Sequence, residues 1–257
     1  MLSEVRETID TIRKQGIRLS APVLVDLVGL IIFIFVNSIY IEKIVAALTS
    51  FNMHVSRNME EIMGDLLTKK DIFALMSKYP QIGNDISTVL FLTFLMLLSL
   101  FIIYCIFQGI SWFFAYKFAG HKESLSRIML RFSLVNIPWF LFFMIVSFIS
   151  LLFSLRAVLS SSPVSFTNMI SGIISFLFIY VVVVSYTRLH IKNPFRAVKL
   201  AGRKELFIGY LAGFGGFLLL GLVIRQLPFS LQLILEVFFL LPLLTGLRVF
   251  FLKLSKN

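Results

Sequence analysis

Long apolar runs alternate with short polar segments along the whole chain. A run of about 20 apolar residues can cross a bilayer as an α-helix, whose backbone polar groups are satisfied internally. The pattern therefore predicts an all-α fold: a polytopic integral membrane helical bundle that forms a single membrane domain over residues 1–257. Six transmembrane helices are expected, at residues 22–45, 86–116, 135–155, 166–186, 207–224 and 229–252.

The segment before the first apolar run has the spacing of an amphipathic helix. Across residues 3–19, apolar side chains recur at helical intervals among charges of both signs, which places them on one stripe of a helix surface. The apolar run that follows is too long for the hydrophobic region of a signal peptide, and no small-residue cleavage pattern follows it. We therefore expect an N-terminal amphipathic helix and then an uncleaved first span.

Residues 46–85, between the first two apolar runs, are polar enough to lie outside the bilayer. Two apolar stripes of helical spacing predict a helical hairpin here, inserted between spans one and two on the outer side of the membrane. Within the second apolar run, Gly109 is expected to divide a span from an interfacial aromatic turn that contains Trp112 and Tyr116. Pro242 is expected to kink the sixth span.

A basic segment leads into the fifth apolar run. Asn193 can cap a helix, and Pro194 suits the first helical position, where a missing N–H costs no hydrogen bond. The apolar residues that follow recur at helical spacing, so the pattern predicts a helix that lies on the cytoplasmic membrane surface. Its basic side chains are expected to contact lipid headgroups: Arg196, Lys199, Arg203 and Lys204.

Small residues line one face of the fifth predicted span. Gly209, Ala212, Gly213 and Gly216 fall at positions i, i+3, i+4 and i+7, so this face has little side-chain bulk. Small faces let helix backbones approach closely, and helix association in lipid depends on such packing. We expect a packing face within the bundle, with a dimer face or a flexible gate as alternatives.

The excess of basic residues indicates both a partner and an orientation. The formal net charge is +11, with 24 Lys and Arg against 13 Asp and Glu. These charges flank apolar spans, so anionic lipid headgroups explain them better than nucleic acid does. Lys and Arg are concentrated in the N-terminal segment, in residues 117–131 and 188–204, and after the last span. The positive-inside rule then predicts a multi-pass cell-membrane protein with both termini in the cytoplasm.

Three cytoplasmic segments look alike: ETIDTIRK from Glu7, ESLSRIML from Glu123 and NPFRAVKL from Asn193. Each precedes an odd-numbered span, which suggests a unit of one surface helix and two spans, present three times. The alternative is that any amphipathic helix beside a membrane has this spacing.

Basic surface helices before paired, Phe-rich and Gly-containing spans resemble a family of uncharacterised prokaryotic membrane proteins related to the membrane domain of glycerophosphodiester phosphodiesterases. The resemblance lies in the layout of most of the chain and is strongest over residues 193–216. The polar insertion at 46–85 departs from it. It implies no catalytic residues, because in that family the phosphodiesterase chemistry belongs to a separate soluble domain that this sequence does not contain.

Charged residues inside apolar spans are costly, and they mark either ion pairs or functional sites. Asp26 in the first span and Arg248 in the sixth are expected at similar depth, where they can form an ion pair. Glu236 lies roughly two helical turns from the outer end of the sixth span. It could pair with Arg156 or Arg225 at the outer ends of their spans, or it could bind a proton or solute in a cavity.

Signatures of catalysis and of metal binding are missing from the sequence. There is no H-E-x-x-H, G-x-S-x-G, G-x-x-x-x-G-K-[ST] or G-x-G-x-x-G, and we expect no catalytic, cofactor-binding or metal-binding residues. The leading hypothesis is a non-catalytic subunit or scaffold of a membrane complex, whose partner is a further copy of the chain or another membrane protein. The alternatives are a small-solute transporter or channel that uses Glu236, and a lipid-handling membrane enzyme.

Overall fold

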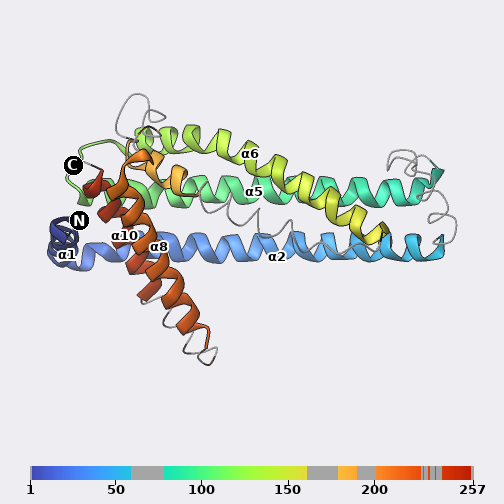
Figure 1. Ribbon diagram of the computed structural model, residues 1–257, viewed down its shortest axis with the longest axis horizontal. Helices are drawn as coiled ribbons and strands as arrows, with labels where there is room; N and C mark the ends of the chain where they lie inside the picture. The colour runs from blue at the N-terminus through green and yellow to red at the C-terminus, as the bar shows by residue number, and fades with distance from the viewer. Residues whose placement is uncertain are drawn as a thin grey trace. The chain divides into compact units, whose positions relative to one another are not determined.

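The computed structural model describes the chain in several stretches, and every regular element in them is a helix (Figure 1). The all-α prediction is confirmed for this part of the chain. The described residues are 2–58, 78–160, 179–189, 199, 201–226, 228, 231, 235 and 239–255. The chain divides into two compact units: unit 1 contains Met1–Ile31, Ile103–Trp139 and Ile174–Asn257, and unit 2 contains Ile32–Ile102 and Phe140–Ile173.

The N-terminal segment of unit 1 is helical, as its spacing predicts. Helix α1 (Leu2–Gln15) is followed by the 3₁₀ turn η1 (Gly16–Leu19). Gly16 has a φ of 47°, a left-handed conformation that glycine adopts at no steric cost, and this residue separates α1 from helix α2 (Ser20–Arg57). Helix α1 packs against helix α10 (Leu241–Leu254), as Figure 1 shows.

The buried side of α1 is polar. Glu4 and Thr8 are buried, whereas Val5 and Ile9, which belong to the predicted apolar stripe, are 37% and 58% exposed. A hydrogen bond from the Lys253 ammonium to the backbone oxygen of Glu7, at 2.6 Å, joins α10 to this helix. Val5 and Ile9 therefore face away from unit 1, whereas Ile12 of the same predicted stripe packs on α10, where a Cβ atom placed at Gly246 would lie 3.1 Å from Ile12 Cδ1.

Helix α2 extends well past the predicted end of the first span. Its 38 residues make a helix about 57 Å long, whereas the hydrocarbon core of a bilayer is about 30 Å thick. No Gly or Pro occurs at residues 46–57, and polar side chains alone do not end a helix. Both ends of the predicted hairpin at 46–85 accordingly lie in α2 and in helix α5 (Pro80–Phe118). The rest of the hairpin, residues 59–77, lies outside the described residues.

The expected division of the second span at Gly109 is wrong, because α5 runs unbroken through that residue. Gly109 faces helix α6 (Leu125–Ser160): a Cβ atom placed there would lie 3.5 Å from the side chains of both Met129 and Phe132. Trp112 and Tyr116 are buried in the core of unit 1. The aromatic residues after Gly109 therefore pack inside the bundle and do not form an interfacial turn.

The segment that begins at Glu123 also differs from its prediction as a separate surface helix. Helix α6 begins at Leu125 and continues through Pro138 to Ser160, so the similar-looking residues are the first turns of the third span itself. In the N-terminal segment, by contrast, Gly16 separates α1 from α2, the helix that contains the first predicted span. Most of the segment from Asn193 lies outside the described residues, and the threefold repeat stays a prediction.

Four described segments are long and apolar enough to cross a membrane: Ser3–Arg57, Pro80–Phe118, Leu125–Ile149 and Lys204–Ile224. They coincide with predicted spans one, two, three and five, and the last of them is helix α8 (Lys204–Ile224). The fourth predicted span is described only from residue 179 onward. In the sixth, Pro242 is the second residue of α10, and the two residues before this helix, 239 and 240, are π-helical. The kink expected at Pro242 stays a prediction. The chain is thus a helical membrane protein, and six spans remain a prediction.

Polar contacts hold residues 186–189, at the end of a helical segment of unit 1. The Tyr116 hydroxyl donates to the backbone oxygen of Tyr186 at 2.7 Å and accepts from the backbone N–H of Leu189 at 2.8 Å. The Arg131 guanidinium donates to the backbone oxygen of Leu189 at 2.9 Å. Because the last carbonyls of a helix have no partner within it, these side chains from α5 and α6 fix where this segment ends.

Changing Tyr116 to Phe should lower the free energy of unfolding by about 1–3 kcal/mol, because a buried N–H and a buried carbonyl both lose their partner. Thermal unfolding in mild detergent, followed by the reactivity of the buried Cys105 thiol, measures this change. Tyr40→Phe is the matched control, because within the described residues the Tyr40 hydroxyl has one contact, and this contact with Ser99 is longer, at 3.2 Å. Equal effects of the two changes would contradict the role assigned to Tyr116.

Candidate functional site

Asp26 of α2 and Arg248 of α10 form a buried ion pair in unit 1. Arg248 Nη1 donates to Asp26 Oδ2 at 2.7 Å, and Nη2 donates to Oδ1 at 3.1 Å. The side chains are 2% exposed for Asp26 and 4% exposed for Arg248. Two parallel hydrogen bonds are the strongest arrangement of a guanidinium and a carboxylate, and such geometry offsets the cost of removing both charges from water. The structure thus brings together the two charges that the sequence places at similar depth.

Helix α5 contributes two further side chains to this ion pair. The Ser111 hydroxyl donates to Asp26 Oδ1 at 2.6 Å, and Gln108 Nε2 donates to the same oxygen at 3.3 Å. Gln108 Oε1 in turn accepts from Arg248 Nη2 at 2.6 Å. We call these four residues the ion-pair cluster. The Asp26 carboxylate accepts four hydrogen bonds, and three helices are joined through it.

A second polar group lies near the ion-pair cluster and is built from Tyr104, Tyr186 and Asn136. The Tyr104 and Tyr186 hydroxyl oxygens are 3.0 Å apart, and the Tyr186 hydroxyl donates to Asn136 Oδ1. Because the single Tyr186 hydroxyl hydrogen points to Asn136, Tyr104 must donate to Tyr186. Asn136 Nδ2 donates to the backbone oxygen of Phe132 at 2.7 Å. This tyrosine chain links α5, α6 and the helical residues 179–186.

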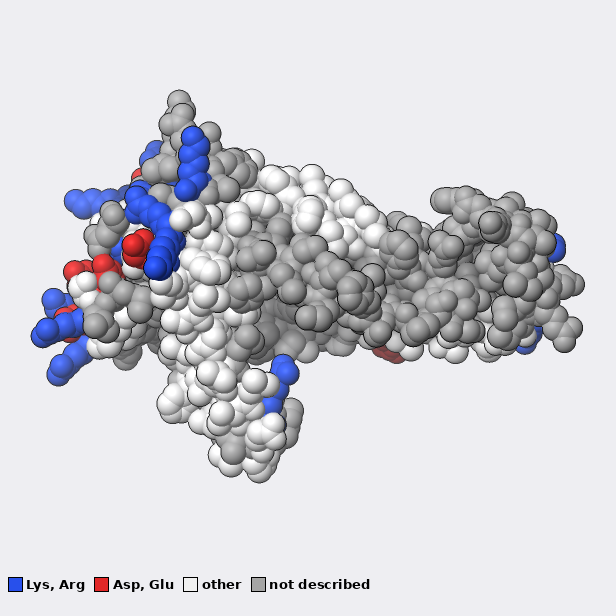
Figure 2. All heavy atoms as spheres, in the orientation of Figure 1, with Lys and Arg blue, Asp and Glu red and all other residues white. Residues whose placement is uncertain are grey.

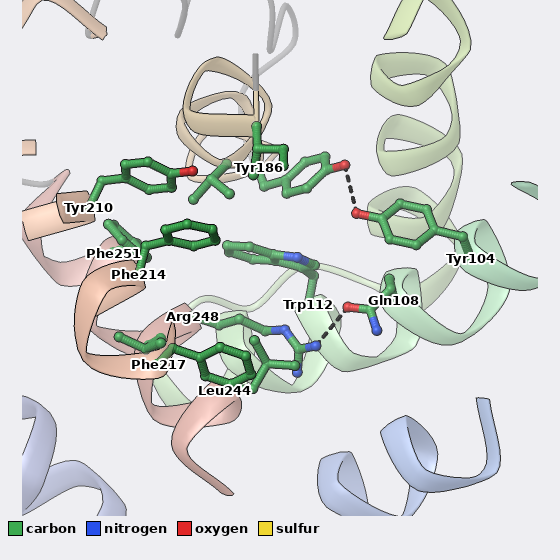
Figure 3. A pocket seen from close by; sticks show the side chains of 13 residues that line it. Tyr104, Gln108, Trp112, Tyr186, Tyr210, Phe214, Phe217, Leu244, Arg248 and Phe251 are labelled. Carbon is green, nitrogen blue, oxygen red and sulfur yellow. Dashed lines mark hydrogen bonds between the residues drawn. The ribbon is translucent and has the colours of Figure 1, made fainter. Parts of the chain in front are cut away.

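A cavity of about 230 Å³ lies beside both groups within unit 1 (Figure 3). Arg248 and Gln108 border it with their mutual hydrogen bond, and Tyr104 and Tyr186 border it with theirs. The remaining walls are apolar, and most of them are aromatic: Trp112, Tyr210, Phe214, Phe217 and Phe251. The polar side chains that border the cavity are therefore already hydrogen-bonded to one another: Arg248 to Gln108, and Tyr104 to Tyr186.

Half of the predicted small face packs against α10. A Cβ atom at Gly209 would lie 2.7 Å from Leu254 Cδ2, and one at Gly213 would lie 2.8 Å from Leu247 Cδ2. Ala212 is exposed, and no atom of the described residues lies within 4 Å of the corresponding point at Gly216. Helices α8 and α10 are thus in close contact at Gly209 and Gly213, and among the described residues this contact does not extend to Gly216.

The other predicted intramembrane charges do not come together in the described part of the chain. Glu236 lies outside the described residues. The backbone of Arg156 belongs to α6, but its side chain is not described, and Arg225 directly follows α8 and is exposed. A pair between Glu236 and either arginine stays a prediction, as does a solute-binding role for Glu236.

The basic residues predicted to contact headgroups are on the surface wherever the structure describes them. Lys199, Arg203 and Lys204 are exposed, and Arg196 lies outside the described residues. Figure 2 shows most of the described Lys and Arg side chains of unit 1 gathered at the end that contains α1. This concentration of positive charge suits contact with anionic headgroups.

Unit 2 contains a polar cluster that the sequence pattern did not single out. His54 Nδ1 lies 2.6 Å from Asp85 Oδ2, and the Ser50 hydroxyl donates to Asp85 Oδ1 at 3.0 Å. Ser50 and His54 are one turn apart on α2, and that spacing is the signal that could have found them. The serine donates to the aspartate and not to the histidine, so the cluster joins α2 to α5 without activating a nucleophile. Within the described ranges, no group of three or more His, Cys, Asp or Glu residues could hold a metal ion.

Changing Asp26 to Asn should lower the free energy of unfolding by about 3–5 kcal/mol, because the Arg248 charge then stays buried without its counter-charge. Arg248→Gln should cost a similar amount for the opposite reason. The double variant should be less destabilised than the sum of the two, since neither charge is left alone. Thermal unfolding in mild detergent tests the cycle, and strictly additive losses would show that the two side chains do not depend on each other.

Changing Gly209 to Leu should destabilise the protein by about 1–3 kcal/mol, because the new side chain overlaps Leu254. Gly216→Leu is the matched change on the same helix, and it should leave stability close to that of the parent because its side chain enters open space. The unfolding temperatures of the two variants, compared in one detergent, decide the matter. A lower unfolding temperature for Gly216→Leu than for Gly209→Leu would contradict a close contact between α8 and α10 at Gly209.

Comparison of the chain with protein-family models, with curated proteins and with solved structures gave no match. The resemblance in layout to the membrane domain of glycerophosphodiester phosphodiesterases therefore stays a prediction.

Proposed function

We propose that this protein is a non-catalytic integral membrane protein that serves as a subunit or scaffold of a membrane complex. The observation that carries the proposal is the free part of the small face of α8. Ala212 and Gly216 are four residues apart and exposed, and no atom of the described residues lies within 4 Å of a Cβ placed at Gly216. Two small residues at this spacing let a second helix approach closely in lipid, so this surface suits a partner helix.

The arrangement of the buried polar groups also supports a structural role. The Asp26 carboxylate accepts four hydrogen bonds from three neighbouring side chains. A carboxylate that carries a proton or solute through a membrane must exchange partners during each cycle. In the ion-pair cluster the charges join helices, and breaking those contacts would cost the bundle its stability.

The proposed placement is a cell membrane, with six spans and both termini in the cytoplasm. Two observations support it. The hydrogen bond between Lys253 and Glu7 joins α1 to the last turn of α10, and this contact supports a placement of both ends on one side, with an even number of crossings. The basic side chains gather at that same end of unit 1 (Figure 2), and positive charge marks the cytoplasmic side.

The proposed partners are anionic lipid headgroups, through the basic residues of the surface helix, and a transmembrane helix, through Ala212 and Gly216. That helix comes either from a second copy of the chain or from another membrane protein. Chemical crosslinking in the native membrane, followed by mass spectrometry of the linked peptides, distinguishes the two.

Changing Gly216 to Leu should abolish crosslinks that involve α8 without changing the unfolding temperature, because the added side chain blocks the approach of a partner backbone. Gly221→Leu is the matched control: it lies on the same helix, about 140° around its axis from Gly216 by helical geometry, and a Cβ placed there also has no atom of the described residues within 4 Å. It should leave the crosslinks intact. A chain that crosslinks to nothing, but moves a solute in vesicles and stops when Glu236 becomes Gln, would replace this proposal with a transporter.

A further inference from the structure

The cavity of unit 1 has a largely apolar lining, and the proposed role as a subunit or scaffold does not account for it. Its walls are largely aromatic and aliphatic, and they come from α5, α8, α10 and the helical residues 179–186. The hydroxyls of Tyr104 and Tyr186 bind each other, and Gln108 binds Arg248 (Figure 3). A polar ligand would have to compete with these contacts, whereas an apolar ligand leaves them in place.

The cavity reaches the surface of unit 1 where that surface is apolar. Ile179 lines the cavity and is 42% exposed, and the lining residues Phe217 and Leu244 are partly exposed. On α8, which is long and apolar enough to span a bilayer, Leu219 and Val223 are 66% and 62% exposed. The medium around such a helix is the hydrocarbon of the membrane, so the cavity is accessible to lipid chains.

The size of the cavity indicates what fills it. Apolar cavities stay dry, and one of roughly 150 Å³ is large enough to bind benzene. At about 230 Å³, this cavity is larger, and leaving it empty would forfeit the packing of its aromatic walls. Gly216 is exposed, and its neighbours Phe214 and Phe217 on α8 line the cavity together with Leu244 of α10. The space therefore lies between side chains of α8 and α10, beyond the close contact at Gly209 and Gly213.

We propose that this cavity binds a hydrocarbon chain of a membrane lipid, which inserts from the bilayer between α8 and the helical residues 179–186. The hydrocarbon chain of the lipid packs against Trp112 and the phenylalanines of the cavity wall. The hydrogen bonds within the ion-pair cluster and the tyrosine chain stay intact. Because the recognised group is hydrocarbon, binding selects the chain of the lipid and not its headgroup.

Trp112 provides a direct test, because it lines the cavity and is only 4% exposed. The chain contains 2 tryptophans, so Trp139→Phe leaves Trp112 as the only indole. This protein is reconstituted in phosphatidylcholine vesicles whose acyl chains carry bromine at mid-chain, which quenches indole fluorescence only near contact. We expect strong quenching of Trp112 despite its burial. Absence of quenching would overturn the proposal. That result is also expected if a side chain of a second copy of the protein fills the cavity in place of lipid.

Variants that fill the cavity make the test specific. In the Trp139→Phe background, Val183→Phe and Leu244→Phe add bulk from two different walls, and each should reduce the quenching by about twofold or more, because a filled space leaves no room for a chain. Val223→Phe is the matched control; it makes the same substitution at a lipid-exposed position outside the cavity and should quench like the parent. Undiminished quenching in both filled variants, or an equal loss in the control, would contradict a chain in the cavity.

The quenching of Trp112 can still be interpreted if Val183→Phe or Leu244→Phe folds poorly. Protection of the buried Cys105 thiol reports folding in the same vesicles, and only protected samples are compared. If both filled variants fail this check, the parent is titrated with brominated lipid diluted in ordinary lipid. Quenching that saturates at a low brominated fraction supports a bound chain, and quenching strictly proportional to that fraction opposes it.

Discussion

A carboxylate in hydrocarbon needs a counter-charge, and this requirement fixes the arrangement of unit 1. Asp26 and Arg248 can meet with two short hydrogen bonds only if α2 and α10 lie at matching depth and turn the correct faces to each other. An error of one residue in either helix rotates the side chain by about 100° and leaves two uncompensated charges. Gln108 and Ser111 add α5 to the same constraint. Position and rotation of three helices thus depend on one carboxylate.

The contact between α8 and α10 has a close part and an open part, and the two parts serve different ends. At Gly209 and Gly213 the absence of a side chain lets α10 approach, which fixes α8 onto the bundle. At Gly216 the same kind of residue is exposed and adds to the surface beside the lining residues Phe214 and Phe217. Glycine therefore allows close packing at one end of the contact between α8 and α10, and it leaves space for other molecules at the other end.

The sequence predicts the apolar helices and the pairing of Asp26 with Arg248, because both follow from the cost of polar groups in lipid. It does not predict where α2 ends, because no Gly or Pro follows the first span and a polar helix can continue into water. The sequence pattern did not single out Ser111, Tyr104 or Tyr186, because Ser and Tyr occur commonly in apolar spans without a functional role. The cavity could not be predicted either: its walls come from four helical segments, and no pattern along one helix encodes how the four are arranged.

The two halves of the ion pair lie 222 residues apart in the chain, and ribosomes make them in a fixed order. At roughly 5–20 residues per second, Arg248 is made on the order of tens of seconds after Asp26. During that interval the Asp26 carboxylate has no arginine partner, and Ser111 and Gln108 can donate hydrogen bonds to it once α5 is in place. Assembly of unit 1 can therefore finish only when the last helix is inserted, and a chain cut short before α10 retains the charge that marks it as incomplete.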